Sequence, residues 1–493
     1  MPGTPASLLP DVIAAAYRAG AMLEAEFARP DGPRFSDHVT CPVDHEMEML
    51  LRDRLVALFP ARFVGEEAGV LAAEANGYCW VVDPHDGTRA FLEGRRGSAV
   101  SVALLRDGIP VLGVVYAPLS PDRGPDMIAW AEGTPGITRN GALVPIDLRQ
   151  RRLTATDVVF LNHGVWQRPV WNGLAVAPGR FMPLPSIAYR LARVAVGDGL
   201  ATVTLRPVNA HDVAAGHALL LAAGGVLTAE DGAPVVYDDQ GQSRPSACFG
   251  GAPLVVNDLR GRTWRGSTEA RREPRVVLTW PRIAPEPVVD RAVGCLLGMA
   301  AGNALGGLVE GMSADAIART HPHGLRDLAD GGVHDALAGQ LTPAGEAAIR
   351  LARAVLAEGG GPATAWTRDH APLLAALRTA IAGGIPAAPG DGTLDFAFAH
   401  LTAGTRLEDA VIQTVAQGGA TAVNAAIVGA LLGAVQGRAA VPVRWAMTVL
   451  TCRPDAASRD AGLPIRDPRP EDCWADDLTD LAEALLLRLQ THM

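Results

Sequence analysis

The stretch WVVDPHDGTRAF, residues 80–91, runs from an apolar segment into two aspartates, a glycine and a threonine. The apolar run before it is typical of a buried strand, and Pro84 cannot continue a hydrogen-bonded ladder. We therefore expect the strand to end at Asp83 and a helix to open around Asp86 and Gly87. Both carboxylates then face one pocket at the carboxyl end of the strand.

Two carboxylates this close need a partner for their charge. Like charges repel strongly at low effective dielectric, so Asp83 and Asp86 persist together only if a cation lies between them or one is protonated. A hard divalent cation with oxygen ligands, Mg²⁺ above all, meets this need. Gly87 allows close approach of the backbone, and free N–H groups at a helix start favour an anion. The motif predicts a metal-and-phosphate site, with a turn and an N-cap as the alternative.

Further acidic residues favour the metal interpretation. VGEEAG places Glu66 and Glu67 at the end of another strand-like run, and AHDVAAG places Asp212 at a helix start. Acidic residues at the ends of three separate elements are unexpected if all of them are surface turns. We therefore expect these residues to share one site.

Length, charge and cysteine content limit the classes to which this protein can belong. At 493 residues the chain is long enough for two domains. Its formal net charge of −10 argues against a nucleic-acid polymer as partner, and its lack of lysine excludes Schiff-base chemistry. The six cysteines lack CxxC spacing and are expected to be buried thiols. We see neither a membrane span of about 18–20 apolar residues nor a basic leader, and so expect a cytoplasmic protein with no membrane partner.

The sequence pattern divides the chain into two parts. Helix-like repeats followed by strand-like runs and further helices predict an α+β domain over residues 1–262. Residues 263–288 are rich in arginine and proline and predict a linker. Residues 289–493 carry alanine- and leucine-rich helical patterns without a convincing strand, which predicts an all-α domain.

Four segments resemble the Mg²⁺-dependent, lithium-sensitive inositol monophosphatase family: VGEE (64–67), WVVDPHDGTRAF (80–91), VSVALLRDGIPVLGVVYAP (100–118) and HDVAAGHALLLAAGG (211–225). The resemblance covers about residues 8–262 and implies a layered α-β-α-β-α sandwich. It also implies in-line hydrolysis of a phosphomonoester by metal-activated water, without a phosphoenzyme. Two or three Mg²⁺ ions would be bound by four acidic side chains and one carbonyl: Glu66, Asp83, Asp86, Asp212 and the backbone carbonyl of His85.

The same resemblance implies roles around these metals. Glu66, Thr88 and Asp44 are the catalytic candidates, with Thr88 and Asp44 helping to activate the water. The amides of Gly87 and Thr88 would hold the phosphate. Asp44 is the least regular of the set, because its spacing from Thr40 is one residue longer than the T-x-x-D of the family.

Two further features concern the substrate. His211 stands where the family has tryptophan, and we expect packing or a substrate contact rather than metal ligation, since Mg²⁺ prefers oxygen. Arg190 and Arg193 lie three apart on one predicted helix and are candidates for a second phosphate, with a solvated helix face as the alternative. The segments GVVYAP and AAGGVLTAEDGAPVVY resemble the 3'(2'),5'-bisphosphate nucleotidase branch more than the inositol phosphatases.

The second half resembles another family but lacks its metal ligands. RAVGCLLGMAAGNALGGLVEG (291–311) and GGATAVNAAIVGALLGAVQG (418–437) resemble the ADP-ribosylglycohydrolase family, whose all-α fold holds two Mg²⁺ ions. The family motif G-D-A-x-G reads GNALG here (302–306), T-D-D-T reads TPAG (342–345), and D-x-D-T reads ATAV (420–423). Without those carboxylates we expect no glycohydrolase activity. A scaffold, a dimer surface or a cleft for an ADP-ribose-like ligand remain as roles.

The sequence thus predicts a Mg²⁺-dependent phosphomonoesterase acting on a small phosphorylated metabolite, preferably a 3'- or 2'-phosphorylated adenine nucleotide. An inositol or sugar phosphate is the alternative substrate. The rival hypothesis is a regulatory or scaffold protein that binds ADP-ribose or NAD, and a homodimer is a further expectation.

Overall fold

A computed structural model describes residues 4–29, 33–34, 41–67, 69–71, 76–92, 95–162, 169–264, 286–358, 371–388, 394–460, 463, 465 and 467–491. The chain divides into two compact units. We call residues 1–167 with 172–265 the N-terminal unit, and residues 168–171 with 266–493 the helical unit. Each unit is described by itself.

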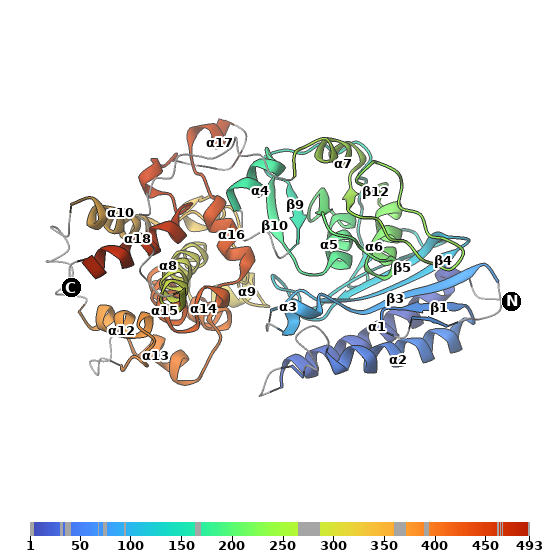
Figure 1. Cartoon of the computed structure of the whole chain (residues 1–493), viewed down its shortest axis with the longest axis horizontal. Coiled ribbons are helices and arrows are strands. Elements are labelled where there is room, and N and C mark those ends of the chain that lie inside the picture. The colour runs from blue at the N-terminus through green and yellow to red at the C-terminus, as the bar shows by residue number, and fades with distance from the viewer. Residues whose placement is uncertain are drawn as a thin grey trace. The chain divides into compact units, whose positions relative to one another are not determined.

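The N-terminal unit begins with two helices, α1 (Pro5–Phe27) and α2 (Pro42–Leu58). Thr4 caps α1 by accepting a hydrogen bond from the Ser7 amide, and proline stands at the first turn of both helices, where its missing N–H costs nothing. Their apolar faces pack on one face of a large sheet, so both helices form the outer layer next to that sheet (Figure 1).

The large sheet has eight strands in the order β2-β1-β3-β4-β5-β6-β7-β8. The strands are β1 (Arg62–Gly65), β2 (Val70–Leu71), β3 (Tyr78–Asp86), β4 (Ala99–Arg106), β5 (Ile109–Ala117), β6 (Asp126–Ala131), β7 (Thr138–Arg139) and β8 (Ala142–Leu143). Strand β3 pairs in parallel with β1 and antiparallel with β4. The parallel pair brings the carboxyl ends of β1 and β3 to one edge.

The predicted end of the central strand is three residues too early. Asp83 pairs with Ser101, the register then shifts, and Asp86 pairs with Ala99. Pro84 lies inside this irregularity, where a residue without an N–H is tolerated. The strand therefore ends at Asp86, and the short helix α3 (Thr88–Leu92) follows Gly87.

The second sheet has five strands in the order β10-β9-β11-β13-β12. Its strands are β9 (Val158–Leu161), β10 (Arg180–Pro183), β11 (Ala201–Thr204), β12 (Val226–Ala229) and β13 (Cys248–Gly251). Helices α5 (Ile187–Ala195) and α6 (Ala210–Ala222) lie between the two sheets, and α7 (Pro253–Arg260) covers the outer face, while α4 (Pro169–Val176) precedes β10 (Figure 1). This arrangement confirms the predicted α-β-α-β-α sandwich.

The helical unit contains no named strand among its described residues, as predicted. Its α-helices are α8 (Glu286–Gly307), α9 (Ala314–Thr320), α10 (Pro343–Glu358), α12 (Ala371–Ile381), α13 (Asp395–Thr402), α14 (Leu407–Ala416), α15 (Thr421–Gln436), α16 (Val443–Thr451), α17 (Ala456–Asp460) and α18 (Leu478–Thr491). Its described residues also form the 3₁₀ turns η3 (Gly332–His334), η4 (Arg438–Ala440) and η5 (Glu471–Cys473).

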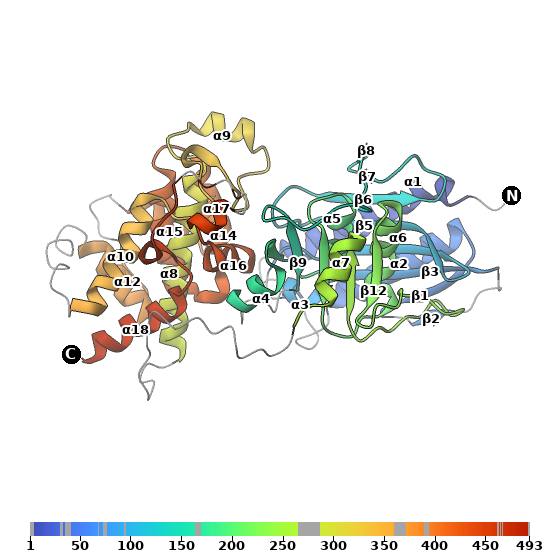
Figure 2. The same ribbon diagram turned by 90° about the horizontal axis from the view of Figure 1, so that it is seen from above.

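Helices α8 and α15 form the centre of the helical unit and lie side by side (Figure 2). A Cβ atom on Gly298 would lie 2.1 Å from the carbonyl oxygen of Gly429, so the two backbones touch directly. Residues Pro287–Gly307 form a helix long and apolar enough to cross a membrane by length and composition, which corrects the expectation that the sequence holds no such run. Since 67% of that window is buried inside the protein, this segment has the character of a core helix.

Two other expectations can be compared with the structure. Most of the predicted linker, residues 265–285, lies outside the described residues, and α8 starts at Glu286, before the predicted boundary at 289. All six cysteines are free and buried, as predicted.

Candidate metal and phosphate site

Four acidic side chains from separate elements converge at the carboxyl edge of β1 and β3. Glu66 directly follows β1, Asp83 and Asp86 lie at the end of β3, and Asp212 lies in the first turn of α6. Asp83, Asp86 and Asp212 offer carboxylate oxygens within 4.8 Å of one another, and Glu66 and Asp83 form a second such group with His211. The fold thus brings together the four carboxylates that the sequence singled out.

Burial and mutual repulsion make this cluster costly to ionise. Burial raises the pKa of Asp83 well above its ordinary value, and the negative charges of its acidic neighbours add to the rise. Burial, followed by the charge of Asp212, raises the pKa of Asp86 to about 7. The pKa of Glu66 also rises to about 7, first through desolvation of its carboxyl group by the surrounding protein, although the residue as a whole is exposed. Such a donor set fits a divalent cation, which would neutralise these groups and let them ionise.

Hydrogen bonds hold the three aspartates of the cluster in place. Asp86 accepts bonds of 2.7 Å from the Ser186 hydroxyl and from the Ala188 amide at the start of α5. Asp83 accepts one of 2.9 Å from the His85 amide. Asp212 accepts one of 2.5 Å from the Asn209 amide, as the third residue of a capping box. The orientation of the cluster therefore depends on the starts of α5 and α6.

Gly87 and Thr88 form the turn that was predicted to hold phosphate. Gly87 has φ +105°, and a Cβ atom on it would lie 3.2 Å from the Cα and Cβ atoms of Ser98. Glycine is therefore needed here for both its backbone conformation and its lack of a side chain. The Thr88 hydroxyl donates a bond of 2.8 Å to the carbonyl oxygen of His85, one of the predicted metal-ligand atoms.

Asp44 reaches the same region from α2, but its partner is a histidine ring. Asp44 Oδ1 lies 2.6 Å from His85 Nδ1, and both side chains are buried. Asp44 also accepts a long bond of 3.4 Å from the Cys41 amide in the capping box of α2. The Thr88 hydroxyl is directed to the backbone of His85, so Asp44 and Thr88 are connected through that residue. Thr40 lies outside the described residues.

Glu48 is a site residue that sequence reasoning missed. It lies one helical turn after Asp44 on the buried face of α2 and is only 1% exposed. Its carboxylate accepts a bond of 2.8 Å from the Glu67 amide, which fixes the turn that carries Glu66. A Cβ atom on Gly65 would lie 2.4 Å from Glu48, so the glycine of VGEE makes room for this carboxylate. The signal for Glu48 in the sequence was an acidic residue among the apolar positions of a predicted helix.

Arg190 and Arg193 occupy neither of the places expected from the sequence. Both are buried, at 2% and 3% exposure, so the solvated helix face is wrong. Arg193 forms ion pairs of 2.8 Å with Asp122 and with Asp198, and these acidic partners favour a structural role over contact with a second phosphate.

Arg190 faces the interior behind the acidic cluster. Its guanidinium group donates to the Ser186 and Val203 carbonyls and to the Thr202 hydroxyl. Burial lowers its pKa to about 10, and its positive charge counteracts the rise in the pKa of Asp86. Its burial and these internal bonds favour a role as a buried countercharge over the predicted substrate contact.

His211 lies next to Asp212 in the first turn of α6, with its side chain 13% exposed. Burial lowers its pKa to about 4, so its ring is neutral near neutral pH. One ring nitrogen lies within 4.8 Å of ligand oxygens of Glu66 and Asp83. The structure thus places this side chain at the acidic cluster.

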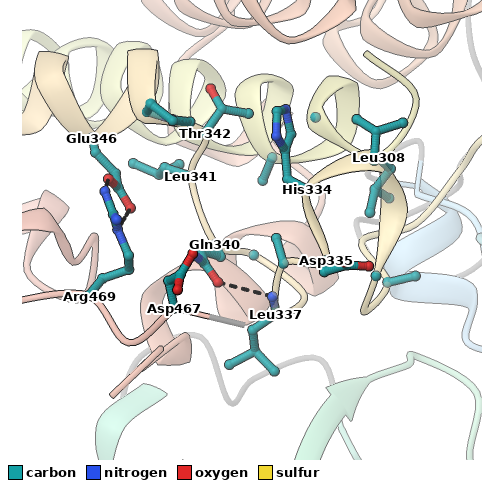
Figure 3. Close-up of a pocket in the computed structure, with 18 residues that line it drawn as sticks. Leu308, His334, Asp335, Leu337, Gln340, Leu341, Thr342, Glu346, Asp467 and Arg469 are labelled. Atoms are coloured by element: carbon teal, nitrogen blue, oxygen red, sulfur yellow. Dashed lines mark hydrogen bonds and ion pairs between the residues drawn. The ribbon is translucent and has the colours of Figure 1, made fainter. Parts of the chain in front are cut away.

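The helical unit carries its own cavity, of about 240 Å³, next to the altered motifs (Figure 3). Asn303, at the motif position where aspartate was expected, bonds to Thr342: its Oδ1 accepts a bond of 2.9 Å from the Thr342 amide, and its Nδ2 donates one of 3.0 Å to the Thr342 hydroxyl. In Figure 3, Asp335 and Asp467 line the cavity, together with the ion pair between Glu346 and Arg469. Among the described residues of this unit, no three acidic, histidine or cysteine side chains form a metal-binding group.

Comparison with known proteins agrees with this division. Residues 7–247 match the Inositol monophosphatase family, and residues 284–396 and 368–492 match the ADP-ribosylglycohydrolase family. The inositol-1-monophosphatase of Mesorhizobium japonicum is 32% identical over 253 residues, which cover 47% of this chain and 89% of that protein. The histidinol-phosphatase of Mycobacterium tuberculosis is 33% identical over 34% of this chain and 65% of its own length.

Among solved structures, an inositol monophosphatase from Anabaena is 24% identical, with a TM-score of 0.41, and covers 51% of this chain and 93% of that one. Since identity to the relative from Mesorhizobium japonicum extends over nearly all of that enzyme, the chain belongs to the inositol monophosphatase family, a family of Mg²⁺-dependent phosphomonoesterases, and its C-terminal half matches the ADP-ribosylglycohydrolase family.

Proposed function

We propose that the N-terminal unit hydrolyses a small phosphorylated adenine nucleotide at its 3'- or 2'-phosphate. The observation that carries the phosphatase role is the convergence of four carboxylates beside the Gly87 turn. Two or three Mg²⁺ ions would be held by oxygen atoms of five residues: Glu66, Asp83, Asp86, Asp212 and the carbonyl of His85. When bound, such ions supply positive charge for the phosphate oxygens and lower the pKa of water.

The protein's own groups then orient the phosphate and the water. The backbone amides of Gly87 and Thr88 bind phosphate oxygens. The positive φ of Gly87 makes these amides accessible. Thr88 and Asp44 position the attacking water, and the buried contact of Asp44 with the His85 ring restricts where that carboxylate can move. No side chain needs to become phosphorylated, because water is the nucleophile.

The nucleotide preference has separate grounds from the phosphatase role. It rests on the likeness of GVVYAP and AAGGVLTAEDGAPVVY to the bisphosphate nucleotidase branch, and on the pairing of this unit with a domain whose family handles ADP-ribose. The named relatives include an inositol phosphatase and a histidinol phosphatase, so an inositol or sugar phosphate remains the second choice of substrate. The buried positions and internal contacts of Arg190 and Arg193 argue against their use for a second phosphate.

A substrate panel tests this proposal. Phosphate release is measured with Mg²⁺ from 3'-phosphoadenosine 5'-phosphate, a 2'-phosphorylated dinucleotide and inositol 1-phosphate, with lithium as inhibitor. We expect the nucleotides to be cleaved fastest. We also expect Asp83→Asn to lower kcat at least about 100-fold, since removing an ionised ligand disrupts the metal site.

The control is Asp53→Asn, which alters an exposed carboxylate on α2 that is paired with Arg52. It should leave phosphate release unchanged. Failure to cleave any phosphomonoester, or full activity of Asp83→Asn, would refute the phosphatase role, whereas faster cleavage of inositol 1-phosphate would refute only the nucleotide preference.

We also propose that the helical unit is catalytically inactive and binds a ligand in its cavity. The Asn303 amide occupies the space of a lost metal ligand, and a Cβ atom on Gly345 would lie 2.3 Å from its oxygen, so the surrounding helix is packed around it. The cavity favours a binding role, although it is below the usual size of about 300–1,000 Å³ for ligand pockets. The carboxylates of Asp335 and Asp467 line the cavity and would repel the negatively charged pyrophosphate. An uncharged part of ADP-ribose would therefore enter the cavity.

Calorimetry on the full chain distinguishes these roles. Micromolar binding of ADP-ribose or NAD in the presence of a chelator, without any release of ADP-ribose from modified arginine, is expected. Substituting Ala304→Leu, at a buried position that lines the cavity, should weaken this binding at least about tenfold by filling the space. Absence of binding would refute the sensor role, and hydrolysis of ADP-ribosyl-arginine would refute inactivity.

A further inference from the structure

His211 supplies a nitrogen donor to a cluster that otherwise consists of carboxylates. Its position is fixed by α6, whose first turn also carries Asp212. The His211 carbonyl accepts a bond of 3.3 Å from the Ser101 hydroxyl, and Ser101 pairs with Asp83 across the sheet. The start of α6 is therefore tied to the strand pair that carries the site, and the imidazole is held beside it.

Three donor atoms from three elements meet at this point. A ring nitrogen of His211 and one carboxylate oxygen each from Glu66 and Asp83 lie within 4.8 Å of one another. Two ligand atoms on one ion lie up to about 4 Å apart when each bond is about 2.1 Å long. Small side-chain rotations would therefore close this group on a cation.

The His211 ring is not held by a hydrogen bond to the adjacent Asp212. His211 Nε2 lies 3.8 Å from Asp212 Oδ1, which is too long for a hydrogen bond. Asp83 belongs both to this group and to the group with Asp86 and Asp212. One carboxylate thus joins two adjacent donor sets, one of oxygen atoms alone and one that includes nitrogen.

The two donor sets favour different ions. Mg²⁺ takes oxygen ligands, whereas imidazole nitrogen favours first-row transition metals. We propose that Glu66, Asp83 and His211 bind a transition-metal dication such as Mn²⁺, Co²⁺ or Zn²⁺, beside an all-oxygen Mg²⁺ position at Asp83, Asp86 and Asp212. This inference rests on the metal site of the proposed function and assigns His211 as a ligand, in place of the packing or substrate contact expected from the sequence.

Direct detection of nitrogen on the bound ion tests the proposal. Full-length protein is stripped with a chelator, loaded with Mn²⁺ without substrate, and measured by pulsed electron paramagnetic resonance, which detects the nitrogen nucleus of a coordinated imidazole. We expect this nitrogen coupling in the wild type and its loss in His211→Gln. His45→Gln, which removes an exposed imidazole on α2 close enough to influence Glu67, should keep it.

A calorimetric titration gives an independent readout. His211→Gln should weaken binding of Co²⁺ at one position at least about tenfold and leave Mg²⁺ binding nearly unchanged. Should His211→Gln fail to fold, His211→Phe takes its place, and the wild-type spectrum still shows whether nitrogen is coordinated.

The outcomes separate this inference from the phosphatase role. Mn²⁺ that binds without nitrogen coupling, or coupling that survives in His211→Gln, would overturn the ligand role of His211 and leave the phosphatase proposal standing. If no divalent ion binds to the wild type at all, both proposals fail.

Discussion

At the scale of single residues, Asp86 shows how burial, a neighbouring charge and hydrogen bonds act in opposite directions on one pKa. It is buried between two hydrogen-bond donors at the start of α5 and the negative charge of Asp212. The donors favour its ionised form, while burial and Asp212 favour the protonated one, and the net result is a raised pKa. A bound cation would resolve this conflict, because it stabilises the ionised form of every carboxylate around it.

The raised pKa values predict a pH dependence that differs with and without metal. Asp86 and Glu66 have folded-state pKa values of about 7, above their unfolded values. Their contribution to the stability of the metal-free protein is therefore full below about pH 4 and is lost as pH rises through about 7. A cation must displace these protons, so it stabilises more at higher pH.

We accordingly expect Mg²⁺ to raise Tm more at about pH 8 than at about pH 5.5, measured against chelator-treated protein by calorimetry. Glu66→Gln, which removes one of the titrating ligands, should reduce the difference. An equal Mg²⁺ effect at both pH values would contradict the assignment.

Gly87 gives a second prediction at this scale. In Gly87→Ala the new Cβ atom meets Ser98 and the residue must keep φ +105°, so the turn shifts and the amides of the phosphate cradle move. We expect kcat to fall at least about tenfold and the free energy of unfolding to fall by about 1–3 kcal/mol. Gly141→Ala is the matched control, because Gly141 also has a positive φ, of +83°, but no atom within 4 Å of the new Cβ. It should lose stability and keep full activity.

At the scale of elements, the starts of helices position the site. Ser186 caps α5 by accepting a bond of 2.9 Å from the Tyr189 amide, and its hydroxyl donates to Asp86. The same side chain therefore stabilises a helix and orients a carboxylate of the proposed metal site. Asp212 combines the same two tasks at the start of α6.

Ser186→Ala should separate these two tasks. Loss of the cap is expected to cost about 1 kcal/mol of unfolding free energy. Loss of the bond to Asp86 removes a group that lowers its pKa, so the acidic limb of the kcat/KM profile should move to higher pH. Ser313→Ala removes an equivalent cap from α9 and should leave the profile unchanged. An identical pH profile in Ser186→Ala would show that this bond does not tune Asp86.

At the scale of the whole molecule, two units with different interiors share one chain. The N-terminal unit packs helices on both faces of its sheets, whereas the helical unit centres on the direct backbone contact of α8 with α15. The carboxylate cluster lies wholly in the first unit, and the cavity of Figure 3 lies wholly in the second. Catalysis and the role of the second domain can therefore be perturbed separately.

Gly298→Ala tests this separation. Its Cβ atom would overlap the Gly429 carbonyl, which should destabilise the helical unit by about 3 kcal/mol or more. Calorimetry should show one unfolding transition moved to lower temperature, with phosphate release retained. Gly404→Ala, with no atom within 4 Å of its new Cβ and φ +64°, is the control for backbone strain alone. Parallel loss of phosphate release in Gly298→Ala would show that the two units depend on each other.

The sequence by itself determined the layered fold of the first half, the all-α character of the second, and the acidic set at 66, 83, 86 and 212. These features are local, because strand and helix periodicity, turn residues and the ends of elements are written in consecutive positions. The altered motifs of the second half could also be identified from the sequence, because the absence of a carboxylate can be recognised without the tertiary structure.

Only the tertiary structure decided which side chains serve the site and which serve the interior. From the sequence, Arg193 was expected on the surface or at a phosphate. The fold brings Asp122, which is 71 positions away in the chain, to 2.8 Å from it. Glu48 and His211 likewise acquire their partners only when α2 and α6 dock against the ends of β1 and β3. The energy of a buried charge depends on neighbours that are distant in sequence, so no local pattern can assign it.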